Sequence, residues 1–198
     1  MLAAETWSTP SQNLAQKWLD DCFENHELCR KLGSEEGSLP TRLIFIDQSS
    51  SSPLLRLVET AAFKSKPRFT SLSHCWGSEK PMMLTQIKYQ DFRTNIPYED
   101  LNKLFQDAIQ ASGRLGINYI WIDCLCIVQD SREDWLNESA RMGAVYRNSY
   151  LNIAGTGFKD GNAGLFVQRN PDRLSTTILI ETLQSGGTTV GGFFNSSL

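Results

Sequence analysis

Chemically reactive side chains gather in two short segments of the 198-residue chain. The first is Ser73-His74-Cys75-Trp76-Gly77, and the second begins at Asp123 and continues Cys124-Leu125-Cys126. A serine and a histidine just before a glycine can border a phosphate, because the backbone approaches closely there. The alternative for His74 is a buried ring that fixes the turn by hydrogen bonds. For Asp123, which ends an apolar run, we favour a ligand contact over a cap for a neighbouring helix or turn.

Cys75 beside His74 also suggests a thiol nucleophile with a histidine base. Adjacent residues at a strand end usually point to opposite sides, so these two do not easily form such a pair. The only other histidine is His26, far away in the sequence. We therefore do not expect a cysteine hydrolase. The sequence also lacks the GxGxxG and Walker patterns of ordinary dinucleotide and P-loop sites.

A third group, Cys22, His26 and Cys29, stands at positions i, i+4 and i+7, which converge on one face of a helix. With one of the three remaining cysteines it could bind zinc, although the usual paired CxxC spacing is missing. The alternative is a packing face, since cysteine behaves as a small hydrophobic residue. We favour packing, and we expect reduced thiols, no metal site and no bound cofactor.

These groups need strands and helices to position them. Short apolar runs predict strands at 42–47, 54–60, 68–73, 117–123, 150–154 and 178–183. Helical periodicity predicts helices over 11–32 and 98–115. A third helix is expected to begin at Ser131, and the acidic residues of its first turn are favourable charges at a helix N-terminus. The alternation of strand and helix favours a mostly parallel, open α/β sheet with helices on both faces and an additional N-terminal helix. Ligands bind such sheets beyond the carboxyl ends of the strands, here Ser73–Cys75, Asp123–Cys124 and the Gly155–Gly157 turn.

Composition limits the class of protein further. Nineteen basic and 22 acidic residues give a net charge of -3, which argues against a nucleic-acid-binding domain. No apolar run is long enough to span a membrane and no signal peptide is visible near Met1, so we expect a cytoplasmic protein. We expect a helical extension at 1–38, one domain at 39–183, and a flexible or truncated tail at 184–198.

Several ordered blocks of the sequence resemble the fungal heterokaryon incompatibility (HET) domain. They include Ser73–Gly77, Leu115–Asp130 and Tyr146–Asn148, and the similarity extends over about Leu39–Pro171. The resemblance implies a fungal cytosolic domain that triggers cell death when incompatible cells fuse. It also implies an upstream NLR-like receptor or an allelic incompatibility partner, and activity that depends on self-association.

HET domains in turn resemble TIR domains, many of which cleave NAD at the nicotinamide–ribose bond, so the resemblance implies a TIR-like or flavodoxin-like sheet. It points to Glu138, three residues after Trp135, as the catalytic carboxylate that stabilises the ribosyl cation. Glu138 shares a helical face with Trp135 and Met142, where an unpartnered carboxylate would be costly. Its alternative role is an ion pair with Arg141 or Arg147. The remaining expected site residues are His74 and Asp123 as catalytic groups, and Ser73, Cys75, Trp76, Gly77 and Trp135 around the nucleotide. The alternative function is a non-enzymatic signalling module that acts by oligomerising.

Overall fold

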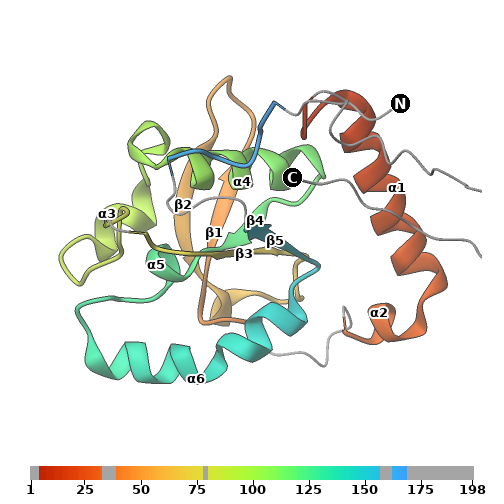
Figure 1. Ribbon diagram of the computed structural model, residues 1–198. Coiled ribbons are helices and arrows are strands. Elements are labelled where there is room, and N and C mark those ends of the chain that lie inside the picture. The colour runs from red at the N-terminus through yellow and green to blue at the C-terminus, as the bar shows by residue number, and fades with distance from the viewer. Residues whose placement is uncertain (1–4, 33–38, 78–79, 157–161, 169–198) are drawn as a thin grey trace, which may run out of the picture.

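The computed structural model describes residues 5–32, 39–77, 80–156 and 162–168 (Figure 1). The helices are α1 (Thr9–Asn25), α2 (Glu27–Leu32), α3 (Tyr89–Thr94), α4 (Lys103–Arg114), α5 (Asp123–Cys126) and α6 (Arg132–Asn148). The strands are β1 (Arg42–Asp47), β2 (Leu54–Glu59), β3 (Thr70–His74), β4 (Tyr119–Trp121) and β5 (Leu151–Gly155). Two 3-10 turns lie at Thr60–Ala62 and Tyr98–Asp100. The strand expected at 178–183 falls outside the described residues.

The strands form one sheet in the order β2-β1-β4-β3-β5. Strand β3 pairs in parallel with β4 and with β5, whereas β1 is antiparallel to both β2 and β4. The open α/β class is confirmed, but the sheet is mixed, so the expectation of mostly parallel pairing is wrong. For β1 and β2 the reason is the short connection at 48–53, because it can close only an antiparallel hairpin, whereas parallel neighbours need a crossover of roughly a dozen residues or more.

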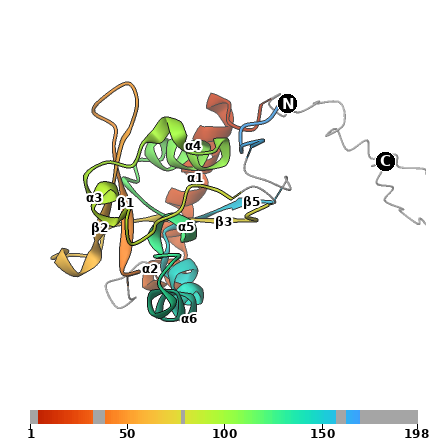
Figure 2. The ribbon, with the colours of Figure 1, turned by 90° about the vertical axis from the view of Figure 1, so that its left-hand side faces the viewer.

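Helices cover both faces of the sheet, with α4 on one side and α6 on the other (Figure 2). Helix α4 buries Leu104, Phe105 and Ala108 against the core, and the side chain of Asn102 caps it by accepting the Phe105 N–H at 2.9 Å. Helix α6 starts after Ser131, as expected, and the Ser131 hydroxyl accepts the Asp134 N–H at 3.3 Å. These helices supply the crossovers from β3 to β4 and from β4 to β5.

In the central apolar run around β4, Ile120, Trp121 and Ile122 are fully buried. The regular strand within it is shorter than the expected 117–123, and Asp123 does not end a strand. It begins the one-turn helix α5, and its own Oδ1 accepts the Cys124 N–H at 2.7 Å. An aspartate side chain that bonds a nearby backbone N–H favours such a turn over continued extension.

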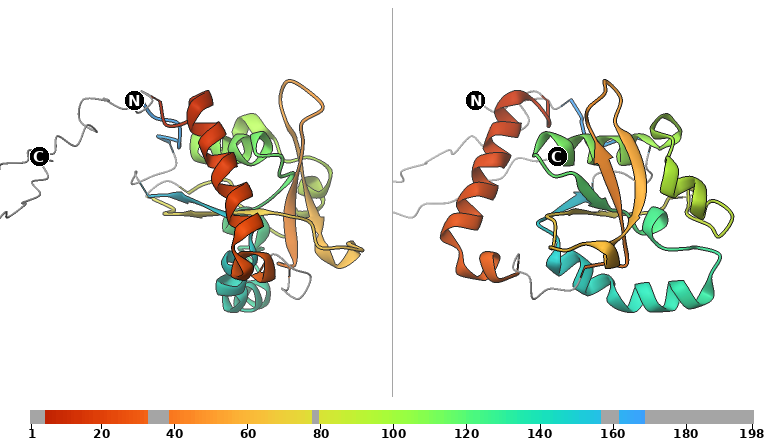
Figure 3. Two further views of the ribbon diagram at one scale, coloured as in Figure 1. Left: turned by 90° about the vertical axis from the view of Figure 1, so that its right-hand side faces the viewer. Right: turned by 180° about the vertical axis from the view of Figure 1, so that it is seen from behind.

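The N-terminal helix expected over 11–32 is two helices, because the chain breaks at His26 with φ −106° and ψ 110°. Helix α1 runs past the β5 edge of the sheet (Figure 3). Its Phe23 contacts Tyr150 with ring centroids 5.8 Å apart, and Trp7 stacks on Phe166 at 5.3 Å. No residue of α1 is buried. Within the described ranges, every helix is too short or too polar to cross a membrane.

Candidate functional site

Three of the expected site residues meet where parallel neighbours β3 and β4 reach their carboxyl ends. His74 is the last residue of β3, and Asp123 follows β4. The His74 Nε2 atom lies 3.8 Å from Asp123 Oδ1, and Trp76 donates its indole N–H to Asp123 Oδ2 at 2.8 Å. The topology therefore brings together an imidazole, a carboxylate and an indole from two separate segments.

The His74 ring is almost fully enclosed, with 2% of its side chain exposed. It packs edge-to-face against Phe105, with ring centroids 5.1 Å apart. Its Nε2 atom has no hydrogen-bond partner within the described part of the chain. Burial lowers the pKa of His74, while the Asp123 carboxylate and a hydrogen bond to the Leu72 backbone act in the opposite direction. A mainly neutral imidazole at neutral pH, with one nitrogen still free to bond, can accept or donate a proton to a ligand.

His74, Asp123 and Cys124 offer ligand atoms within 4.8 Å of one another, and these residues could hold a metal. Cys124 is buried, and this burial, followed by the Asp123 charge, raises the pKa of its thiol well above the usual 9.0. The Cys124 side chain is completely buried, and both Asp123 oxygens already accept hydrogen bonds, from Trp76 and from the Cys124 N–H, with which a metal ion would have to compete. The trio is better suited to hydrogen bonding with an organic ligand.

The other residues of the first segment form the exposed rim of this site. Ser73, Cys75 and Gly77 are exposed, and Trp76 is 38% exposed. The exposed Cys75 and the enclosed His74 lie in different surroundings, as expected for neighbours whose side chains point to opposite sides. A ligand at the end of β3 would meet this rim before it reached Asp123.

Glu138 is a buried carboxylate, 3% exposed, on the sheet-facing side of α6. It accepts a hydrogen bond from the Thr41 hydroxyl, and Arg141 Nη1 lies 3.5 Å from its Oε1. Arg141 also donates to Thr41 Oγ1 and to the Leu39 carbonyl, each at 2.9 Å. Of the two arginines considered from the sequence, the structure pairs Glu138 with Arg141. Across the described residues, no hydrogen bond or ion pair joins Glu138 to His74 or Asp123.

Cys126, on α5, is influenced by both carboxylates. It is fully enclosed, and burial raises the pKa of its thiol to about 12. The Asp123 and Glu138 charges act in the same direction, and the Arg42 charge opposes them. Trp135, the remaining expected nucleotide contact, is 49% exposed on α6.

Sequence reasoning missed the ion pair that fixes α5 and α6 to β1. The buried Arg42 reaches both oxygens of Asp134 at 2.6 Å and donates its Nε–H to the Cys126 carbonyl at 2.7 Å. Asp134 in turn accepts the Val128 N–H at 2.8 Å. The available signal was an arginine at the start of an otherwise apolar strand, since such a charge is buried only when it is paired.

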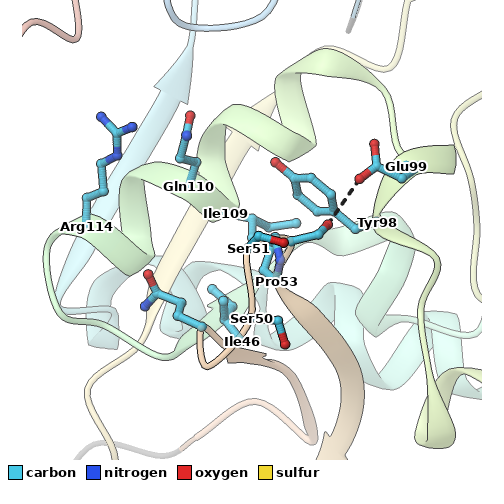
Figure 4. Close-up of a pocket in the computed structure, with 11 residues that line it drawn as sticks. Ile46, Ser50, Ser51, Pro53, Tyr98, Glu99, Ile109, Gln110 and Arg114 are labelled. Carbon is cyan, nitrogen blue, oxygen red and sulfur yellow. Dashed lines mark hydrogen bonds between the residues drawn. The ribbon is translucent and has the colours of Figure 1, made fainter.

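A pocket of ≈ 320 Å³ lies at the opposite end of the central strands (Figure 4). It is lined by Ile46, Gln48, Ser50, Ser51, Ser52, Pro53, Tyr98, Glu99, Ile109, Gln110 and Arg114. Because β1 is antiparallel to β4, its carboxyl end lies beside the amino end of β4, away from Asp123. None of the expected site residues lines this pocket.

Comparison of the chain with curated proteins and with solved structures finds no match. The model of the protein family heterokaryon incompatibility protein (HET) matches residues 69–188, which is more than half of the chain. The matched range contains His74, Asp123 and Glu138, together with every strand and helix from β3 to β5. The chain therefore belongs to the heterokaryon incompatibility protein family.

Proposed function

We propose that this chain is a cell-death effector domain of fungal non-self recognition that cleaves NAD at the nicotinamide–ribosyl bond. Family membership implies the coarser role, in heterokaryon incompatibility. The enzymatic part rests on one observation: the unpartnered, enclosed His74 Nε2 beside Asp123 and the partly exposed Trp76. This group stands at the carboxyl ends of two parallel strands, where open α/β sheets bind their ligands.

In the proposed reaction the bond between ribose C1′ and the nicotinamide nitrogen breaks, and the electron pair leaves with neutral nicotinamide. Positive charge then develops on the ribosyl ring, and water adds to C1′ and loses a proton. Trp76 stacks on a ring of the substrate, Asp123 accepts a hydrogen bond from a ribose hydroxyl, and His74 Nε2 bonds to the sugar or to the attacking water. The backbone of 73–77 borders the phosphates.

Glu138 supplies the carboxylate that stabilises the ribosyl cation. In the described arrangement it is paired with Arg141, whose side chain is 42% exposed. Because the Glu138 carboxylate is buried, separating it from Arg141 carries a substantial cost, which self-association has to supply. We propose that self-association draws Arg141 away and leaves the Glu138 carboxylate facing the substrate, so that the isolated chain is the resting form.

The test is to incubate the pure protein with NAD over a range of protein concentrations and to separate nicotinamide and ADP-ribose by chromatography. We expect equal amounts of both products, at a rate per chain that rises with protein concentration. Glu138→Gln should lower the rate by about a hundredfold or more, the size of effect seen when one transition-state-stabilising group is lost. Trp76→Ala should mainly raise KM.

Glu133→Gln is the matched control, because Glu133 is an exposed acidic residue of the same helix. It should leave turnover unchanged. Absence of turnover by the wild type at every concentration, or equal rates for the wild type and Glu138→Gln, would contradict the enzymatic proposal.

A second candidate is a non-enzymatic module that signals by oligomerising with further copies or with an upstream partner. Exposed apolar side chains favour it: Trp135 and Leu136 on α6 are 49% and 52% exposed, and Trp18 on α1 is 64% exposed. Such side chains on a folded surface often mark interaction sites. If Trp135→Ser with Leu136→Ser abolished both self-association and cell death while the wild type turned over no NAD, this function would replace the enzymatic one.

A further inference from the structure

Cys22, His26 and Cys29 form a compact cluster where α1 meets α2, at a distance in sequence from every residue of the proposed NAD site. The two sulfur atoms are 3.0 Å apart, and His26 Nδ1 lies 3.4 Å from Cys22 Sγ. Ligand atoms of all three lie within 4.8 Å of one another. Zinc with nitrogen and sulfur ligands at about 2.0–2.3 Å holds tetrahedral ligand atoms roughly 3.3–3.8 Å apart. Small side-chain shifts would therefore suffice to admit the ion.

The break between the two helices is what creates this cluster. In a continuous α-helix, residues seven apart are separated by about 10.5 Å along the axis, too far for Cys22 and Cys29 to share one ion. Here α1 ends at Asn25, His26 is extended, and α2 brings Cys29 back against Cys22. Sharp helix breaks usually have an identifiable cause such as proline or glycine, and neither occurs between residues 21 and 31. The contacts of Cys22 with Cys29 and with His26 are the interactions that this break permits.

The surroundings favour a divalent cation with one position left for water. As thiolates, Cys22 and Cys29 would balance the charge of the ion, and Asp21 next to Cys22 adds negative charge. Cys22 and Cys29 also line a pocket of ≈ 130 Å³ together with Phe23, Arg147 and Tyr150, among others. No fourth histidine, cysteine or carboxylate of the described residues joins the group. An open fourth position is typical of zinc sites with three protein ligands.

The cluster would also stabilise the connection between α1 and α2. Helix α1 has no buried residue, and α2 is only six residues long, so neither can depend on a hydrophobic core. A helix as short as α2 is marginal in water without an added constraint. Metal binding provides such a constraint, because its free energy is available only to the folded arrangement.

We propose that Cys22, His26 and Cys29 bind one Zn²⁺ per chain, with water as the fourth ligand on the pocket side. Binding converts both thiols to thiolates and releases their two protons to solvent. The ion then holds α2 against α1. This role is independent of NAD cleavage, so either proposal can fail without the other.

The test uses the full chain, purified under reducing conditions and stripped of metal, and then titrated with Co²⁺ and Zn²⁺. We expect one Co²⁺ per chain, with a thiolate-to-cobalt charge-transfer band and the visible bands of tetrahedral cobalt, both removed by one equivalent of Zn²⁺. Cys22→Ser and Cys29→Ser should each weaken Zn²⁺ binding by about a hundredfold or more. Loss of a group that only supports a metal ligand already costs about 10–100-fold in affinity, and loss of a ligand itself should cost at least as much. His26→Ala should keep thiolate bands but change the visible ones.

Cys75→Ser is the matched control, since Cys75 is an accessible cysteine outside the cluster. It should bind cobalt as the wild type does. Circular dichroism of each metal-free variant distinguishes loss of a ligand from loss of the fold, because α4 and α6 should remain helical. Failure of the folded wild type to bind stoichiometric Zn²⁺, unchanged binding by Cys22→Ser, or octahedral cobalt without a charge-transfer band would overturn the proposal.

Discussion

At the residue scale, His74 couples the proposed site to the stability of the fold. Its ring is enclosed beside Phe105, and burial lowers its pKa from the usual 6.5 despite the nearby Asp123. Between the folded and unfolded pKa values, the unfolded chain binds more protons than the folded one. The contribution of neutral His74 to stability is therefore fully present above pH 6.5 and is lost as the pH falls below that value.

We predict that His74→Gln weakens the dependence of folding stability on pH. Glutamine keeps a hydrogen-bonding side chain but cannot gain a proton, so the variant lacks the penalty of charging a buried ring. Urea denaturation of both proteins between about pH 7.5 and about pH 5.5 should show a larger loss of unfolding free energy for the wild type. Equal losses over this interval would show that His74 does not titrate in the folded protein as its burial requires.

At the element scale, the carboxylate of Asp107 on α4 binds the backbone of residues 162–168. Asp107 is 1% exposed and accepts the N–H groups of Leu165 and Phe166 at 2.8 and 3.1 Å, along with a bond from Lys103. Gly164 makes this approach possible. It has φ +73°, and a Cβ atom there would collide with the Asp107 carboxylate and come within 2.7 Å of Lys103 Cγ.

We predict that Gly164→Ala lowers the free energy of unfolding by about 3 kcal/mol, from backbone strain and a collision with a buried group. Gly116→Ala is the matched control. Gly116 has nearly the same φ, +71°, but no atoms lie within 4 Å of the position its Cβ would take. It should cost only about 1 kcal/mol. Urea denaturation measures the free energy of unfolding of both variants. Equal losses would mean that the collision with Asp107 adds nothing to the destabilisation by Gly164→Ala.

Elements of this fold differ in how well the sequence predicts them. Strand β1 falls on the expected residues and β2 differs by one residue. Both were predictable because short alternating or continuous apolar runs are typical of strands that pack against a core. The capping residue Ser131 likewise marks the start of α6. The break at His26 could not be predicted, since its local sequence contains no helix breaker and its cause lies in side chains that meet only after folding.

At the scale of the whole molecule, the strand–helix alternation predicted the parallel half of the sheet and therefore the meeting of His74 with Asp123. The antiparallel pairing of β1 with β2 could have been predicted from the short connection at 48–53, which leaves no room for a crossover helix. The hydrogen-bond and ion-pair partners of Glu138 could not have been predicted from the sequence. Thr41 is 97 residues away in sequence, and periodicity shows which face a side chain occupies but not what it meets there.

The molecule is also uneven in stability, because its N-terminal helix is attached to a well-buried sheet by few contacts. Arg68 lies between two aromatic rings, with its Cζ 4.5 Å from the Phe23 ring centre and 4.6 Å from that of Tyr150. Each cation–π contact is worth about 0.5–1 kcal/mol. Since α1 buries no residue of its own, we expect it to open locally at a much smaller cost than global unfolding.

We predict that Arg68→Ala speeds hydrogen exchange of the α1 amides by about fivefold or more, the factor that corresponds to about 1 kcal/mol of lost stability. The amides of β1 and α4 should be unaffected, because local opening of α1 does not require the sheet to separate. Arg56→Ala is the control, since Arg56 lies over the ring of Phe45 at 5.0 Å on the opposite half of the sheet and contributes nothing to α1. Peptide-resolved exchange measured by mass spectrometry distinguishes the cases. If α1 exchanged as slowly as β1 in the wild type, or if Arg68→Ala accelerated both equally, the N-terminal helix would be part of the cooperative core and would not be a separately opening element.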